Sequence, residues 1–82
     1  MQIRVLLFGP EARLIDRREL YVSIERQPVT CADLRASLVA IEPRLIPALR
    51  SARFAVNCEF ADDRRQLRAT DEVALIGAVS GG

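Results

Sequence analysis

The chain has 82 residues, half of them apolar and 28% charged, which is the composition of one small globular domain. Its 12 basic residues are all arginine, and 11 acidic residues leave a net charge of +1, too little for a surface that holds a nucleic-acid backbone. The absence of histidine excludes metal sites and catalytic triads built on imidazole.

The same sequence argues for a soluble protein of a reducing compartment. Two cysteines are too few for a disulfide scaffold, and the longest apolar run is about four residues, against the roughly 20 that span a bilayer. The opening residues lead directly into strand-like sequence without the layout of a signal peptide. We therefore expect a cytoplasmic protein with no membrane contact. It is too small to enclose both a core and a substrate cavity, which favours a carrier or an accessory subunit.

Two strands are predicted near the N-terminus. Residues 2–8 and 19–25 both alternate with a period of two. The first is apolar enough at its end to be buried on both faces, whereas the second keeps one solvated face. Gly9 and Pro10 break the first strand, and residues 11–18 are expected to form a loop with one helical turn at most. The core-facing side chains would be Ile3, Val5, Leu7, Leu20, Val22 and Ile24.

A helix follows the second strand. Thr30 and Asp33 have the spacing of a capping box, in which the threonine oxygen accepts an N–H of the first turn. Apolar residues at spacings of three, four and three then define one helix face, and Pro43 ends the helix. That face would consist of Cys31, Leu34, Leu38 and Ile41. A second, short helical piece is expected around Pro47.

Further strands are predicted in the C-terminal half. They are expected at residues 54–57, briefly at Leu67, and at residues 73–76, the last being apolar on both sides. Polar turns through 62–63 and 70–71 separate them.

This order predicts an α+β protein of the β-grasp, or ubiquitin-like, fold. It would contain a mixed sheet of four to five strands with one main helix packed across one face. The first and last strands are the most apolar, so they should lie side by side in the middle of the sheet. We expect a single domain spanning residues 1–82.

Neither cysteine is expected to be a reactive site. Cys31 lies at a predicted helix start but shares the apolar face, and no histidine or lysine is present to activate it. Cys58 follows Asn57 at a predicted turn, without a metal-ligand partner near it in the sequence. The acidic and arginine pairs are interpreted as turns and solvated surface.

The C-terminus carries the motif with chemical meaning. Gly81 and Gly82 end the sequence soon after an apolar strand, and average glycine usage gives such a pair by chance in about one chain in 200. Without β-carbons, this pair could thread a narrow tunnel in another protein and deliver its terminal carboxylate. A frayed end is the alternative explanation. We expect a flexible Gly-Gly tail over residues of about 77–82.

Several motifs in this half of the chain belong together. They are Phe-Ala-Val-Asn at 54–57, Asp-Asp at 62–63, Leu67, Asp-Glu-Val-Ala-Leu-Ile at 71–76 and Val-Ser-Gly-Gly at 79–82. These motifs resemble the small subunit of molybdopterin synthase, a ubiquitin-like sulfur carrier. Residues 5–8 and 12–13 resemble the opening strand of that family and the arginine after it.

The sequence departs from the pattern of that family at three places. Leu14 stands where glutamate is usual, Thr70 where glycine is usual, and Gly77-Ala78 where two prolines are usual. Prolines would stiffen the exit from the sheet, so their replacement raises the cost of ordering the tail in a partner.

The resemblance implies a two-step chemistry on Gly82. An adenylating enzyme of the type that activates ubiquitin would adenylate the Gly82 carboxylate, using ATP with Mg. A sulfur donor system would then replace the AMP by sulfur. The thiocarboxylate would then enter the large subunit of molybdopterin synthase and give its sulfur to a pterin precursor in molybdenum cofactor biosynthesis. All catalytic side chains would lie on partners, so no cofactor or metal is expected on this chain.

The resemblance also implies which residues contact the partner. Gly81 would keep the tail slim, and Val79 and Ser80 would place it. Leu75 and its neighbours on the last strand, with Phe8 on the adjacent one, are candidates for an apolar docking surface of a stable heteromer, and some of them are expected to belong to the core instead.

Two other functions stay open. A sulfur carrier for thiamine or another thiolated metabolite would use the same tail, although carriers of the thiamine pathway tend to be shorter. A ubiquitin-like interaction module or a protein modifier would need no sulfur on Gly82. The Asp-Glu-Val and Val-Ser-Gly-Gly motifs favour the molybdopterin branch.

Overall fold

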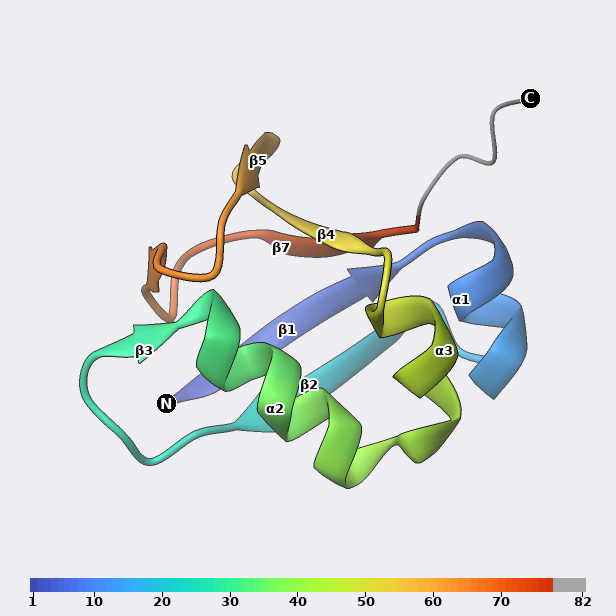
Figure 1. Ribbon diagram of the computed structural model, residues 1–82. Coiled ribbons are helices and arrows are strands. Elements are labelled where there is room, and N and C mark those ends of the chain that lie inside the picture. The colour runs from blue at the N-terminus through green and yellow to red at the C-terminus, as the bar shows by residue number, and fades with distance from the viewer. Residues whose placement is uncertain (78–82) are drawn as a thin grey trace.

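The computed structural model describes residues 1–77 and consists of a twisted sheet with helices across one face (Figure 1). Its strands are β1 (Gln2–Leu7), β2 (Glu19–Ser23), β3 (Val29–Thr30), β4 (Arg53–Val56), β5 (Glu59–Ala61), β6 (Gln66–Leu67) and β7 (Val73–Ile76). Its helices are α1 (Gly9–Ile15), α2 (Cys31–Ile41), the short 3-10 helix η1 (Pro43–Leu45) and α3 (Ile46–Leu49).

The main sheet confirms the predicted β-grasp topology. Its five strands follow the order β2-β1-β7-β4-β5, and β3 and β6 form a separate two-stranded ladder. The first and last strands, β1 and β7, are parallel neighbours, with Val5 opposite Val73 and Leu7 opposite Leu75. The strands β2 and β4 flank this central pair in antiparallel orientation.

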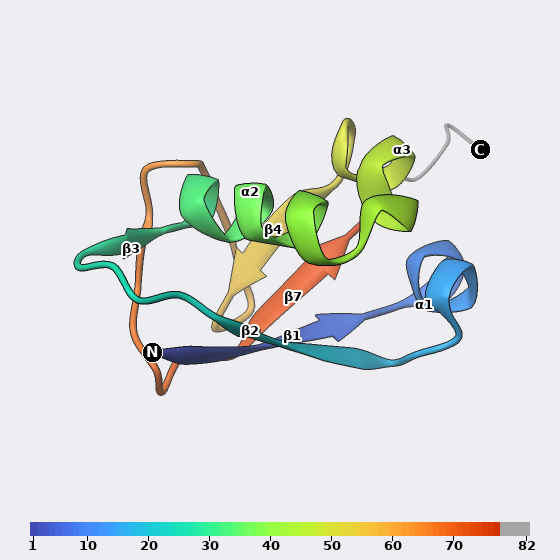
Figure 2. The ribbon, with the colours of Figure 1, turned by 90° about the horizontal axis from the view of Figure 1, so that it is seen from below.

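The core lies between the sheet and the helices. All six predicted core residues of the first two strands are buried, from Ile3 to Ile24. The end of the first strand, in contrast, is not buried on both faces, because Phe8 is 53% exposed. Figure 2 shows the reason: α2 and α3 cover one face of the sheet, and within residues 1–77 no helix covers the other.

Helix α2 begins with the predicted capping box. The Asp33 N–H donates to Thr30 Oγ1 at 3.3 Å, and the Thr30 N–H donates to Asp33 Oδ2 at 3.0 Å. Three of the four residues predicted for its inner face are fully buried, namely Cys31, Leu34 and Leu38. The fourth prediction is wrong, since Ile41 is 53% exposed. The core beneath the end of the helix is filled instead by buried leucines of η1 and α3.

The capping box predicts a pH dependence of stability. Hydrogen bonds from Thr30, first its backbone N–H, hold the pKa of the Asp33 carboxyl below its ordinary value of 3.8. A carboxyl with a depressed folded-state pKa stabilises the fold above its unfolded pKa, and this contribution is lost as the pH falls through the folded pKa. We expect the melting temperature of Asp33→Asn to fall less than that of the wild type between about pH 6 and about pH 3. Thermal unfolding followed by circular dichroism measures this, and equal losses would contradict it.

One strand of the C-terminal half, β5, was not predicted, although the turn before it at Asn57 and Cys58 was. Asn57 and Cys58 both have positive φ values, 52° and 69°, and form a two-residue turn that pairs Val56 with Glu59. The strand β5 therefore returns along β4 before the expected polar turn at 62–63. The strand at Leu67 does form, but it pairs with β3 outside the main sheet.

Helix α1 is longer than the single turn expected. Gly9 and Pro10 end the strand as predicted, but they also begin a helix of seven residues. Proline is tolerated there because the first N–H groups of a helix have no intrahelical acceptor. Gly9 and Pro10, which interrupt the alternation of apolar residues, thus mark both the end of β1 and the start of α1.

Candidate functional site

Residues 78–82 of the predicted tail lie outside the described residues. This applies to Val79, Ser80, Gly81 and Gly82, so their roles stay predictions. The structure does describe where the chain leaves the sheet, because β7 ends at Ile76 and Gly77 follows. Since β1 and β7 are parallel, this exit lies at the end of the sheet that also carries Phe8 and α1 (Figure 1).

The uncovered side of the sheet, which we call the open face, runs up to this exit. Strand alternation places on it one apolar row from β1 to β5: Leu6 pairs with Ala74, Ala74 with Ala55, and Ala55 with Phe60. Phe60 is 58% exposed, and Leu6, Ala55 and Ala74 are partly exposed. An apolar row without a covering layer is typical of a surface that binds a partner.

Of the two predicted docking residues, the structure supports the exposure of one. Phe8 has an extended backbone and is 53% exposed, at the end of the open face. Leu75 is fully buried in the core, so the prediction that its side chain docks to a partner is wrong. The period of two places its neighbours Ala74 and Ile76 on the open face instead.

Charged and polar side chains border the apolar row. Arg4 and Glu19 form an ion pair of 2.6 Å, and the Tyr21 hydroxyl donates to Glu19 at 3.3 Å. On the other side of the row, the Arg53 guanidinium lies 4.3 Å from the centre of the Phe60 ring. An apolar centre with a polar border is the usual anatomy of a protein–protein interface.

An open groove of about 700 Å³ adjoins this surface near the exit of the chain. It lies between the end of β1, with Leu6 and Phe8, and the first turns of α1, with Ala12. Arg18 lines its border. The groove extends the apolar row to the end of the sheet where the chain leaves β7.

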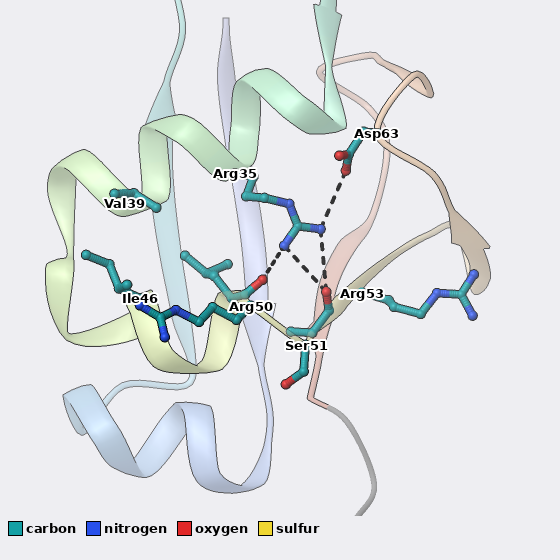
Figure 3. A pocket seen from close by; sticks show the side chains of 9 residues that line it. Arg35, Val39, Ile46, Arg50, Ser51, Arg53 and Asp63 are labelled. Carbon is teal, nitrogen blue, oxygen red and sulfur yellow. Dashed lines mark hydrogen bonds and ion pairs between the residues drawn. The ribbon is translucent and has the colours of Figure 1, made fainter.

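A second depression, of about 600 Å³, lies on the helical side of the protein (Figure 3). Its central side chain, Arg35, donates to the carbonyl oxygens of Leu49 at 2.6 Å and Ala52 at 3.4 Å, and its guanidinium lies 3.6 Å from Asp63. These bonds tie α2 to the end of α3 and to the segment between α3 and β4. Because the guanidinium is already used, we assign this depression a structural role.

The two cysteines differ in environment. Cys31 is fully buried, which confirms the prediction of a core residue, and this burial raises the pKa of its thiol. Cys58 is exposed in the β4–β5 turn. Among residues 1–77, no three histidine, cysteine, aspartate or glutamate side chains are grouped so that they could hold a metal ion. In that same range, none of the helices has the length and apolar character needed to cross a membrane.

One residue near the exit was missed by the sequence analysis. Glu11 on α1 is 5% exposed, and its carboxylate lies directly against Gly77. A glutamate in a predicted loop is expected in solvent, so no sequence pattern singled it out.

The fold and its open face define a ubiquitin-like protein of the β-grasp class. Residues 5–82 match the ThiS family, and the chain belongs to that family.

Two relatives are similar in sequence to this chain over its full length or nearly so. The molybdopterin synthase sulfur carrier subunit of Chlamydomonas reinhardtii is 33% identical over 84 residues, covering 100% of both chains. The subunit of the same name from Dictyostelium discoideum is 29% identical, covering 99% of this chain and 96% of its own.

Solved structures of similar proteins have the same fold over the full length of the chain. SAMP1 of Haloferax volcanii has a TM-score of 0.85 and 26% identity, with 100% of both chains covered. A chain of the complex of subunits 1 and 2 of molybdopterin-converting factor from Helicobacter pylori has a TM-score of 0.72 and 26% identity, again with 100% of both covered. These similarities confirm both the predicted fold and the resemblance on which the functional expectation rests.

Proposed function

We propose that this chain is the sulfur-carrying small subunit of a molybdopterin synthase. The observation that carries the proposal is its full-length similarity to two relatives that bear this name. The open face beside the exit of the C-terminal segment fits the proposal, because such a carrier must dock on partners while it delivers its end to their active sites.

The chemistry of the proposal takes place on Gly82. A carboxylate oxygen attacks the α-phosphorus of ATP in an adenylating enzyme, and pyrophosphate leaves. Sulfide (HS⁻) from a donor then displaces AMP from the acyl carbon and leaves a thiocarboxylate, whose sulfur is the nucleophile toward the pterin precursor. This chain contributes the acyl carbon and a slim tail, and Gly81, Ser80 and Val79 place that tail in the partner.

The partner of the open face would be the large subunit of the synthase. The Helicobacter pylori neighbour belongs to a complex of two subunits, which supports a heteromeric assembly for this chain as well. The apolar row with Phe8 at its end supplies the contact, and the bordering ion pair of Arg4 and Glu19 sets its register. The same proposal includes adenylation by the activating enzyme, which uses ATP with Mg, and sulfur loading. Both steps would take place in the cytoplasm.

A protein modifier is the second candidate function. The specific observation in its favour is the TM-score of 0.85 with SAMP1 of Haloferax volcanii. A second structure of that protein gives its name in full as small archaeal modifier protein 1. Delivery of sulfur to thiamine or another thiolated metabolite is the alternative within the carrier class. The modifier and the alternative carrier would both use an activated Gly82. The molecule that accepts the sulfur or the Gly82 acyl group therefore distinguishes these functions.

Docking through the open face predicts a loss of affinity in Phe8→Ser. Serine is favoured at the position before a helix, so α1 should be kept while the exposed ring is removed. We expect the dissociation constant with the large synthase subunit of the host to rise roughly tenfold or more, as for an aromatic side chain that an interface buries. Isothermal titration calorimetry with the purified subunit measures this.

The matched control for this variant is Ile41→Ser. Ile41 is also 53% exposed, but it lies on α2, on the covered side of the sheet. Its affinity should stay within about threefold of the wild type. Equal affinities for Phe8→Ser and the wild type would place the interface elsewhere, and a wild type that does not bind the subunit would contradict the proposed function.

A further inference from the structure

The two edge strands of the main sheet differ in how they are protected from pairing. Edge strand β5 has three residues and carries Glu59, whereas β2 has five, and within residues 1–77 no strand lies on its outer side. Lysine, proline and bulges are the usual devices that keep an edge from pairing. Strand β2 contains neither residue, and its register with β1 is continuous from Glu19 to Ser23, without a bulge. The charge of Glu19 is already paired with Arg4 on the open face.

The backbone groups of alternate residues in β2 point away from β1. Ile24 and Met1 exchange hydrogen bonds in both directions, at 2.9 and 3.0 Å, and the Arg18 carbonyl accepts an N–H of β1 at 2.8 Å. In an antiparallel ladder, such bonded pairs recur at every second residue, and the residues between them direct their N–H and C=O groups outward. The outward-facing groups of β2 are therefore those of Glu19, Tyr21 and Ser23.

This edge is complementary to a second copy of itself. When two β2 strands pair antiparallel about Tyr21, the two tyrosines stand opposite each other, and Glu19 stands opposite Ser23 of the other copy. Tyr21 is 55% exposed, and aromatic pairs directly across a ladder stabilise it. Beyond the strand ends, the same register brings Arg17 of one copy to Glu25 of the other, and both side chains are exposed. The second copy therefore supplies the opposite charge at both ends of the contact.

We propose that β2 is a self-association edge, through which two copies of this chain pair antiparallel into one continuous sheet. Residues directly opposite each other in a ladder point to the same face, so the helices of both copies lie on one side and both open faces on the other. The pairing thus leaves each open face uncovered for a different partner. Because the contact is small, we expect a weak and reversible dimer. The inference uses the edge alone and does not depend on the proposed function.

Sedimentation velocity of the full-length chain tests the pairing. Between micromolar and millimolar concentrations, the average mass should rise from the 9.1 kDa of one chain toward twice that value. Ser23→Pro should weaken the association roughly tenfold or more, because proline lacks the N–H that Ser23 would donate in both copies. An edge strand tolerates proline where the N–H faces solvent, so the monomer should stay folded. Ser23→Thr keeps the N–H and is the matched control, which should associate like the wild type.

A charge reversal tests the register without any change to the backbone. At low ionic strength, Glu25→Arg should weaken the association roughly fivefold, since two arginines would then stand opposite each other. Adding Arg17→Glu to the same chain restores the opposite charges, and the dissociation constant should return to within about twofold of the wild type. Glu59→Arg makes the same charge change on the other edge strand and should leave the association unchanged.

A ¹H–¹⁵N spectrum locates the contact within the sheet. As the concentration rises, the amide signals of Glu19, Tyr21 and Ser23 should shift, and those of β5 should stay in place. Association that instead shifts the signals around Phe60 would overturn the proposal and indicate pairing through the open face. Signals of β2 that move only when the large subunit is added would overturn it as well and assign the edge to the heteromer.

The remaining outcomes also decide the question. A wild-type chain that stays monomeric at millimolar concentration would overturn the proposal. The same holds for a Ser23→Pro variant that is folded by circular dichroism and still associates like the wild type. If that variant does not fold, the charge reversal decides, and a Glu25→Arg chain that Arg17→Glu does not rescue would contradict the register.

Discussion

Removal of Gly82 is expected to abolish sulfur transfer and to leave the folded domain unchanged. The deletion moves the terminal carboxylate back by one residue, about 3.5 Å of extended chain. A reacting group tolerates a misplacement of only about 1 Å before its rate falls by about 10²-fold. The core ends with β7, six residues before Gly82, so the melting temperature should not change. Single-turnover transfer to the pterin precursor and thermal unfolding measure the two effects.

Gly81→Ala provides a graded comparison for the deletion. It keeps the length of the tail but adds one methyl group, so activation or transfer should slow without being abolished. If the chain without Gly82 transferred sulfur at the wild-type rate, every carrier function considered for this protein would be excluded. If both changes lowered the melting temperature equally, the tail would be a part of the fold.

Leu34→Ala is expected to destabilise the domain by about 2–5 kcal/mol, the range for buried leucines. Leu34 is fully buried on the inner face of α2, where the helix packs against the sheet. A domain of this size has a total stability of only about 5–15 kcal/mol, and 1 kcal/mol corresponds to about 4–8 °C in the melting temperature. The variant should therefore melt at least about 8 °C below the wild type or be unfolded.

Ile41→Ala is the matched control on the same helix. Both residues belong to the face predicted from the apolar spacing, but Ile41 is 53% exposed. The control should cost no more than about 0.5 kcal/mol, as at other surface positions. Similar losses for the two variants, measured by urea or thermal unfolding, would show that the packing of α2 differs from the one described.

The alternation of apolar residues was sufficient to predict β1 and β2, and a continuous apolar run predicted β7. A strand with one buried face needs a period of two, and the buried residues of β1 and β2 have it. The capping box at Thr30 and the proline at Pro43 likewise marked both ends of α2 correctly, because both signals act locally on the backbone. Local chemistry of this kind can be read from one sequence.

The features that were missed depend on tertiary structure. The return of β5 along β4 depends on a left-handed Cys58, a conformation that the residue type does not announce. The assignment of Leu75 to the surface failed for another reason, because alternation alone does not reveal which face of a sheet the helices cover. The contact of Glu11 with Gly77 joins residues at opposite ends of the chain, so no local pattern contains it.

The mass of the protein purified from its own host tests the central claim most directly. If Gly82 carries sulfur, a fraction of the intact chain should be about 16 Da heavier than the free acid, as expected when sulfur replaces one oxygen. Fragmentation should locate this difference on Gly82, and it should be lost when the activating enzyme is deleted. The account would be contradicted if the chain remained the free acid in the presence of the adenylating enzyme, ATP with Mg and a sulfur donor. A mature form that continues beyond Gly82 would contradict it as well.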